Sequence, residues 1–283
     1  MIELFEQEIQ TSTRQSSKGN QLKWTDGEFW YKADYTGYEG LAEYMVSNLL
    51  RYSDLRPEEY VLYETEEIKY GSQVYKGCRS RNFLKKGWQL ITLERLFQIQ
   101  FGESLYKAVY QIPDYEKRLR FLVEQTERVT GLEDFGAYMC KVLTVDAVFL
   151  NEDRHTHNIA VLWDGDSGFD YCPIFDQGAG LLADTVMDYP LEQDVFELMT
   201  KVEAKTFCRS FEEQLDIAEG LYGEQIHFQF GEKEIRELLE RDEVYPIEVK
   251  NRVYMILLQQ RRKYQYLFWY SNTIEGIPSH RRV

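Results

Sequence analysis

The chain of 283 residues carries a formal net charge of −15, from 48 acidic and 33 basic side chains. This excess of acid argues against general nucleic-acid binding, because that function needs cations to displace the counterions of the phosphate backbone. Hydrophobic residues at 43% and aromatic residues at 15% exclude a disordered chain and predict one large domain or two lobes with separate cores.

The sequence contains no segment typical of secretion or of a membrane span. Its first ten residues are acidic and lack an apolar stretch, and the longest apolar run, residues 253–258, is too short to cross a bilayer. Four cysteines lie far apart, at Cys78, Cys140, Cys172 and Cys208. They form no CxxC pair, which is typical of reduced thiols, so we expect a cytoplasmic protein.

Strand-like segments crowd the first third of the chain, with one helix among them. Strands are expected at residues 22–34, which hold two strands around a turn at 25–28, and at 59–70 and 72–84. The helix is expected at 37–53, where Leu41, Met45 and Leu49 fall on one stripe. The predicted order is therefore two strands, a helix and two further strands.

From about Leu90 the apolar spacing changes to that of amphipathic helices. The segments with this spacing are residues 92–102, 114–131, 132–150, 191–202, 209–223, 232–243 and 247–271. This order predicts an α+β fold with two lobes. The small β-rich N-terminal lobe would span residues 1–85 and the larger helical lobe residues 86–283.

A β-hairpin is predicted inside the helical part. Two apolar runs, residues 159–163 and 169–175, flank the turn sequence DGDSG. If they pair antiparallel, Asn158 at the start of one strand faces Asp176 at the end of the other, and Asp153 precedes them in the leading loop. Asp and Asn are common turn and cap residues, so each alone could be structural.

Together these three side chains suit a different role. Mg²⁺ prefers hard oxygen ligands and is usually held by one or two carboxylates plus substrate phosphates. Asn158 and Asp176 could supply such ligands, and a third acid, Asp153, could orient or deprotonate an attacking hydroxyl.

A zinc-dependent hydrolase is the alternative for the same stretch. His155 and His157 form an H-x-H pair, but a catalytic zinc site normally takes three protein ligands. The remaining histidines, His227 and His280, lie in distant segments, so carboxylates would have to complete the site.

The sequence NEDRHTHN, followed by PIFDQG, resembles the catalytic loop and metal-binding segment of HipA-like serine/threonine kinases. The D-R-H-x-x-N core also occurs in phosphatidylinositol kinases, which share the distant kinase-like fold. The resemblance implies a protein-kinase-like fold that uses ATP and Mg²⁺. It implies Asp153 as catalytic base, Asn158 and Asp176 as Mg²⁺ ligands, and His155 as a residue that orders the loop. Asp146 matches an acid that precedes this loop and has a structural role.

A kinase also needs a phosphate-binding lysine, a helix glutamate and a phosphate-covering loop upstream. Lys32 lies in the second strand, just before the helix, and is the candidate lysine, although a strand lysine alone could simply be exposed. Glu43, inside the helix, is its expected partner. Glu39 is the second candidate and could instead serve the helix dipole. The adenine is expected near residues 81–90.

The phosphate-covering loop is expected at residues 11–22, a Ser-rich stretch with a single glycine and no G-x-G-x-x-G pattern. HipA-like kinases also lack that pattern, and some phosphorylate a serine in this loop. The resemblance therefore makes Ser12, Ser16 and Ser17 candidates for nucleotide contact and autophosphorylation, although an ordinary flexible loop would have the same composition.

The resemblance implies a bacterial kinase core without the extra N-terminal subdomain of full-length HipA proteins. By analogy alone it implies a toxin with a small antitoxin or regulatory partner and a translation-related protein as substrate. A lipid or small-molecule kinase would share the same catalytic residues, and a non-catalytic nucleotide-binding scaffold would share the fold. We expect neither nucleic acid nor a membrane among the partners.

Overall fold

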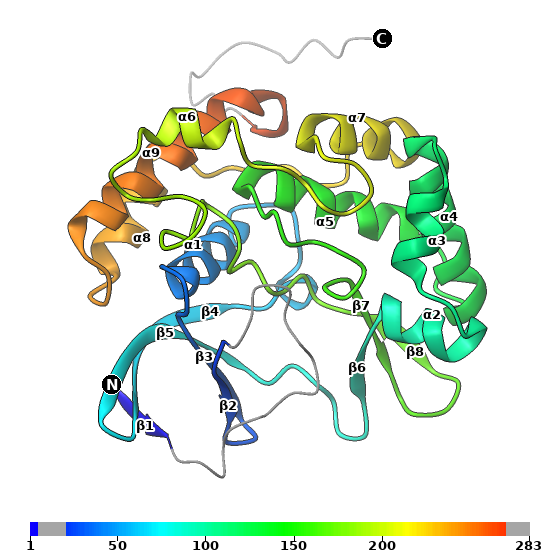
Figure 1. Cartoon of the computed structure of the whole chain (residues 1–283), viewed down its shortest axis with the longest axis horizontal. Helices are drawn as coiled ribbons and strands as arrows, with labels where there is room; N and C mark the ends of the chain where they lie inside the picture. Colours follow the sequence, from blue (N-terminus) through cyan, green and yellow to red (C-terminus); the bar gives the residue numbers. More distant parts are fainter. Residues whose placement is uncertain (5–20, 270–283) are drawn as a thin grey trace, which may run out of the picture.

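The computed structural model describes residues 1–4 and 21–269, which form a β-rich N-terminal part and a larger helical part (Figure 1). The N-terminal part holds a five-stranded sheet with the strand order β1-β4-β5-β3-β2. Its strands are β1 (Ile2–Leu4), β2 (Lys23–Thr25), β3 (Phe29–Ala33), β4 (Tyr63–Tyr70) and β5 (Gln73–Arg81). All pairs are antiparallel except β1 with β4, which is parallel.

The turn between β2 and β3 is built from local hydrogen bonds. Asp26 Oδ1 accepts from the backbone N–H of Glu28 at 2.9 Å and of Phe29 at 2.7 Å. Gly27 has a φ of 95°, in the left-handed region that favours glycine. The turn fixes the register of the hairpin and places Lys23 directly opposite Lys32.

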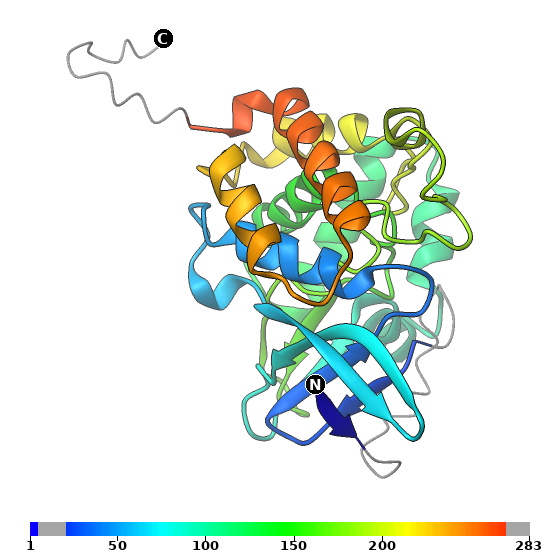
Figure 2. The ribbon, with the colours of Figure 1, turned by 90° about the vertical axis from the view of Figure 1, so that its left-hand side faces the viewer.

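Helix α1 (Glu39–Leu50) lies between the sheet and the helices α8 (Glu232–Arg241) and α9 (Ile247–Lys263), as Figure 2 shows. Its residues Leu41, Met45 and Leu49 are fully buried and belong to the same hydrophobic core as residues of α8 and α9. The core of the sheet is separate and centres on Trp24 and Tyr31. Helix α1 is therefore packed as part of the helical body.

The other helices are α2 (Leu93–Phe101), α3 (Leu105–Gln111), α4 (Tyr115–Thr130), α5 (Phe135–Phe149), α6 (Val195–Met199) and α7 (Phe211–Tyr222). Side-chain oxygens cap several of their N-termini, because the first backbone N–H groups of a helix lack partners within it. The capping residues are Thr92 for α2, Ser104 for α3, Asp114 for α4, Asp194 for α6 and Ser210 for α7.

A second sheet of three strands lies beside α2, with the order β6-β7-β8. Strands β7 (Ala160–Trp163) and β8 (Phe169–Tyr171) form the predicted hairpin. Strand β6 (Gln89–Thr92) was not predicted, since four residues carry too little periodicity to be recognised alone. It pairs with β7 and joins the hairpin to the connection between the two parts.

The last helix is shorter than predicted. Helix α9 ends at Lys263, and a 3₁₀ turn, Gln265–Leu267, follows it. The chain bends here because Leu267 and Phe268 return to the core, where the ring of Phe268 lies 5.3 Å from that of Phe228.

The predicted α+β architecture, with a β-rich N-terminal region and a helical C-terminal part, is confirmed. Within the described parts of the chain, no helix is both long and apolar enough to cross a membrane. The lobe boundary near residue 85 stays a prediction.

Candidate active site

The hairpin brings the predicted oxygen ligands to one end. Val161 pairs with Tyr171 and Trp163 with Phe169, so that Asn158 before β7 and Asp176 after β8 both line one open cleft. This cleft is open to solvent, and Asp153 and Glu39 also line it. The structure therefore brings Asp153, Asn158, Asp176 and Glu39 together around a single space.

Lys32 of β3 joins the two halves of this site. Its Nζ donates to Glu43 Oε1 at 2.6 Å and to Asp176 Oδ1 at 2.7 Å. Glu43 of α1 is almost fully buried, and its Oε2 accepts from the backbone N–H of Gln177 at 2.8 Å. Glu43 thus holds both the lysine and the backbone next to Asp176.

Charge and burial oppose each other in this group. Burial would lower the pKa of Lys32, but Asp176 and Glu43 raise it well above the usual value. Burial tends to raise the pKa of Asp176, yet Lys32 and Lys23 hold it well below its usual range. Burial also raises the pKa of Glu43, against the opposing effect of Lys32. Lys32 is therefore a cation at neutral pH, and Asp176 is ionised beside it.

The backbone at Asp176 is held in an uncommon conformation. Its φ is 61°, in the left-handed region that residues other than glycine seldom occupy. Such strain persists only where surrounding contacts determine the conformation, and it is concentrated at functional sites. At Asp176 those contacts include Lys32 and the backbone bond from Gln177 to Glu43.

Asp153 and Asn158 are joined within the loop between α5 and β7. The amide nitrogen of Asn158 donates to the carbonyl oxygen of Asp153 at 2.9 Å and to its Oδ2 at 3.1 Å. His155 Nε2 lies 3.6 Å from Asp153 Oδ1, and His155 Nδ1 accepts from the backbone N–H of His157 at 3.2 Å. Burial lowers the pKa of His155, and its loop-ordering role stays a prediction.

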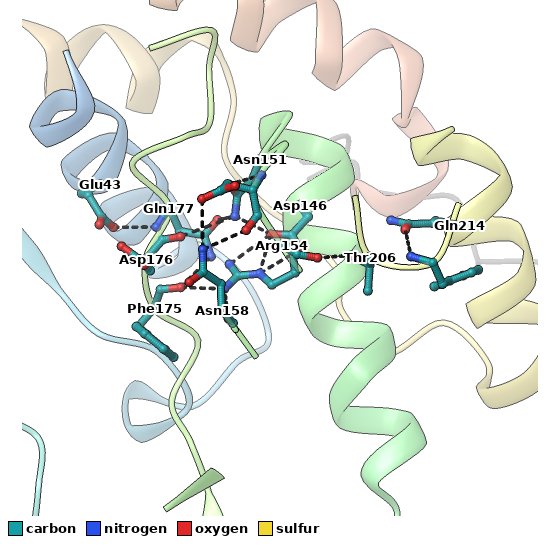
Figure 3. A network of polar contacts seen from close by, with 12 residues as sticks. Glu43, Asp146, Asn151, Arg154, Asn158, Phe175, Asp176, Gln177, Thr206 and Gln214 are labelled. Atoms are coloured by element: carbon teal, nitrogen blue, oxygen red, sulfur yellow. Dashed lines mark hydrogen bonds and ion pairs between the residues drawn. The ribbon is translucent and has the colours of Figure 1, made fainter. Parts of the chain in front are cut away.

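Arg154 is the centre of the polar network in Figure 3, and sequence reasoning gave it no role. It is buried, and its Nε donates to Asp146 Oδ2 at 3.0 Å. Its Nη1 donates to the carbonyl oxygens of Asn158 at 2.8 Å and Phe175 at 3.0 Å. Arg154 therefore fastens the loop to the residue just before Asp176. The sequence offers one signal for this role: an acid, Asp146, precedes the loop, and a base, Arg154, lies within it.

Glu39 has a different position from Glu43. It accepts from the backbone N–H of Thr36 at 2.7 Å and of Gly37 at 3.1 Å, so it orders the chain that enters α1. The partner of Lys32 is Glu43, as the sequence suggested first. Glu39 still lines the cleft.

Lys23 also lines the cleft and was missed. Its signal was present, because a hairpin closed around residues 25–28 places Lys23 opposite Lys32 and on the same face. The predicted serines Ser12, Ser16 and Ser17 lie outside the described residues.

The described residues give no support to a zinc site. Across residues 1–4 and 21–269, no group of three or more His, Cys, Asp or Glu side chains is placed to hold a metal ion. His227 contacts Asp54, with His227 Nδ1 3.2 Å from Asp54 Oδ2, and the exposed His157 packs against the ring of His155. His280 lies outside the described part.

Two of the cleft's side chains carry donor atoms of the kind that Mg²⁺ prefers. The amide oxygen of Asn158 and the carboxylate of Asp176 are hard oxygen ligands on the wall of one cleft. Such a metal is usually held by one or two carboxylates and completed by phosphates and water, so a dedicated cluster of acids is not required.

No family model and no curated protein matches the sequence. Among solved structures, the chain is similar to the crystal structure of CtkA, a proinflammatory kinase of Helicobacter pylori. The two share 14% sequence identity with a TM-score of 0.60, over 93% of this chain and 95% of that chain. At this identity the likeness shows the fold. The kinase-like fold is therefore confirmed, and the HipA-like assignment stays a prediction.

Proposed function

We propose that this protein is an ATP-dependent phosphotransferase. The observation that carries the proposal is the contact of Lys32 with both Glu43 and Asp176, where Asp176 lines one cleft together with Asp153 and Asn158. A strand lysine, a helix glutamate, a loop aspartate and asparagine, and a second aspartate after a hairpin are the parts that kinase chemistry requires.

Each residue has a chemical task in this proposal. Lys32 binds phosphate oxygens, and Lys23, which lies opposite Lys32 on the β2–β3 hairpin and lines the cleft, adds a second cation. Asp153 orients the acceptor hydroxyl and takes its proton, while the hydroxyl oxygen forms a bond to the γ-phosphorus and the bond from that phosphorus to the β-phosphate oxygen breaks. Asn158 and Asp176 would hold Mg²⁺, which neutralises phosphate charge when bound.

The finer assignment rests on the sequence resemblance. We propose a HipA-like kinase that acts on serine or threonine, with autophosphorylation at Ser12, Ser16 or Ser17. A small antitoxin and a translation-related protein substrate belong to the same proposal. A lipid or small-molecule acceptor is an outcome that the experiment below distinguishes.

The test compares the wild type with Asp153→Asn in γ-labelled ATP and Mg²⁺, with protein, lipid and small-molecule acceptors in separate reactions. The expected result is a loss of transfer by about 100-fold or more in the variant, with nucleotide affinity nearly unchanged. Asp166→Asn is the matched control, since Asp166 is an exposed acid in the turn of the same hairpin. Label on a loop serine supports the HipA-like assignment, and equal transfer by wild type and Asp153→Asn contradicts the proposed role of Asp153.

A further inference from the structure

The connection between β3 and α1 is fastened by a residue from the C-terminal helices. Asp34 follows Lys32 by two positions, and its Oδ1 accepts from the backbone N–H of Gly40 in α1 at 2.7 Å. Its Oδ2 accepts from the hydroxyl of Tyr245 at 2.8 Å, across 211 residues of sequence. Tyr245 lies between α8 and α9, so one carboxylate links the sheet, α1 and the helical body.

Two glycines allow this close approach. A Cβ atom at Gly40 would lie 2.6 Å from the hydroxyl oxygen of Tyr245 and 2.5 Å from the carbonyl carbon of Gly77. A Cβ atom at Gly77, in β5, would lie 2.1 Å from the carbonyl oxygen of Lys32. Backbone atoms of α1, β3 and β5 therefore approach closely at this junction, and a shift of Tyr245 would be transmitted to β3 and α1.

The hydrophobic cores on the two sides of this junction are separate, so the junction connects two packed units. Helix α1, with Glu43, shares its core with α5, α8 and α9, whereas β3, with Lys32, has one face in the separate core of the sheet. The contact between Lys32 and Glu43 therefore joins two packed units. Asp34 is the residue that bonds the end of β3 to both α1 and Tyr245.

We propose that Asp34 and Tyr245 are positioning residues, which hold β3 against α1 so that Lys32 meets Glu43 and Asp176. The proposal rests on the proposed function only in naming a nucleotide as the ligand of Lys32. Two other charged groups, Glu39 and Lys76, lie near the carboxylate of Asp34. The Nζ of Lys76 also lies 5.6 Å from the ring centroid of Tyr245.

The first test uses Tyr245→Phe, which removes the hydroxyl and keeps the ring. Tyr264→Phe is the matched control, because Tyr264 is also buried and its hydroxyl has no hydrogen-bond partner in the described part of the chain. The rate at which an acylating reagent labels Lys32 is followed by peptide mass spectrometry, and the dissociation constant of ATP with Mg²⁺ is measured on the same samples.

We expect Tyr245→Phe to raise the labelling rate of Lys32 several-fold and to weaken nucleotide binding about tenfold, or about 1.4 kcal/mol. A residue that only stabilised the fold would lower the amount of binding-competent protein and leave the dissociation constant unchanged. Equal labelling in Tyr245→Phe and Tyr264→Phe overturns the proposal. Absence of nucleotide binding by the wild type overturns the proposed function, while the labelling rate still decides the role of Tyr245.

A conservative exchange at Asp34 gives the second test. Asp34→Asn can still accept from Gly40 and donate to Tyr245, so labelling of Lys32 should stay at the wild-type rate. Asp34→Ala loses both contacts and should label like Tyr245→Phe or faster. If Asp34→Ala fails to fold, the labelling rates of Tyr245→Phe and Asp34→Asn still test the proposal. Rapid labelling of Asp34→Asn contradicts it.

Discussion

Lys32 Nζ lies 2.7 Å from Asp176 Oδ1, so the cation expected to bind phosphate contacts the carboxylate expected to bind metal. Glu43 lies on the other side of the same ammonium group, at 2.6 Å. Two carboxylates therefore share one cation.

Removal of Lys32 should destabilise the fold. In Lys32→Met, the carboxylates of Glu43 and Asp176 lose their shared cation, and we expect the free energy of unfolding to fall by about 3 kcal/mol at neutral pH. The loss should be smaller in mild acid, because burial already raises the pKa of Glu43 and the variant would protonate it more readily. Urea denaturation measures both values.

Lys69→Met is the control for that experiment, since Lys69 contacts Glu3 in an exposed pair at 2.9 Å. We expect its cost to be below about 1 kcal/mol, as for other exposed ion pairs. Equal costs for the two variants would contradict the account of Lys32.

We expect even a conservative exchange at Arg154 to lower the stability of the fold. Its planar guanidinium bonds Asp146 and two backbone carbonyl oxygens at once, and a lysine cannot reproduce this fork. We expect Arg154→Lys to lower the free energy of unfolding by about 3 to 5 kcal/mol, as measured by urea denaturation. Arg120→Lys is the control, since Arg120 pairs with Glu116 in an exposed i,i+4 contact. A cost below about 1 kcal/mol for Arg154→Lys would show that the network does not hold the loop.

Asp34 should make stability depend on pH. Burial and the neighbouring Glu39 raise the pKa of Asp34 to about 7 in the folded chain, above its ordinary value of 3.8. The folded state therefore binds the proton more tightly, and its stabilisation is complete below the unfolded pKa and is lost as pH rises through about 7. Relative to Asp34→Asn, the wild type should lose roughly 2 to 4 kcal/mol between about pH 4 and pH 8.

Denaturation of both proteins across that range measures the difference directly. The Asn variant is the reference because it keeps the shape of the side chain and cannot titrate. Parallel curves for the two proteins would mean that Asp34 does not titrate in this range.

The sequence predicted those parts of the site whose signals are local. A strong turn between two apolar runs was enough to place Asn158 near Asp176, and the spacing of the loop placed Asp153 with them. Lys32 and Glu43 were chosen because the kinase resemblance implies a strand lysine and a helix glutamate, and the predicted order of strand and helix supplied a place for each. Lys23 could also have been predicted, because the turn at residues 25–28 determines that it pairs with Lys32 across the hairpin.

Other parts depend on contacts that a sequence does not display. Strand β6 exists because β7 provides a partner for its edge, and its four residues carry little pattern of their own. Arg154 donates to main-chain carbonyl oxygens, and every residue type has one, so the sequence does not show which residues accept these bonds. The bond between Asp34 and Tyr245 spans 211 positions and follows from the packing of α1 against α8 and α9.

Calorimetric titration of ATP into the wild type and Asp176→Asn, each with and without Mg²⁺, tests the central claim most directly. If Asp176 and Asn158 hold the metal and Lys32 the phosphates, Mg²⁺ should strengthen ATP binding to the wild type by about tenfold or more and should have little effect on the variant. Wild-type affinity that is the same with and without Mg²⁺, or no saturable ATP binding at all, would contradict the account.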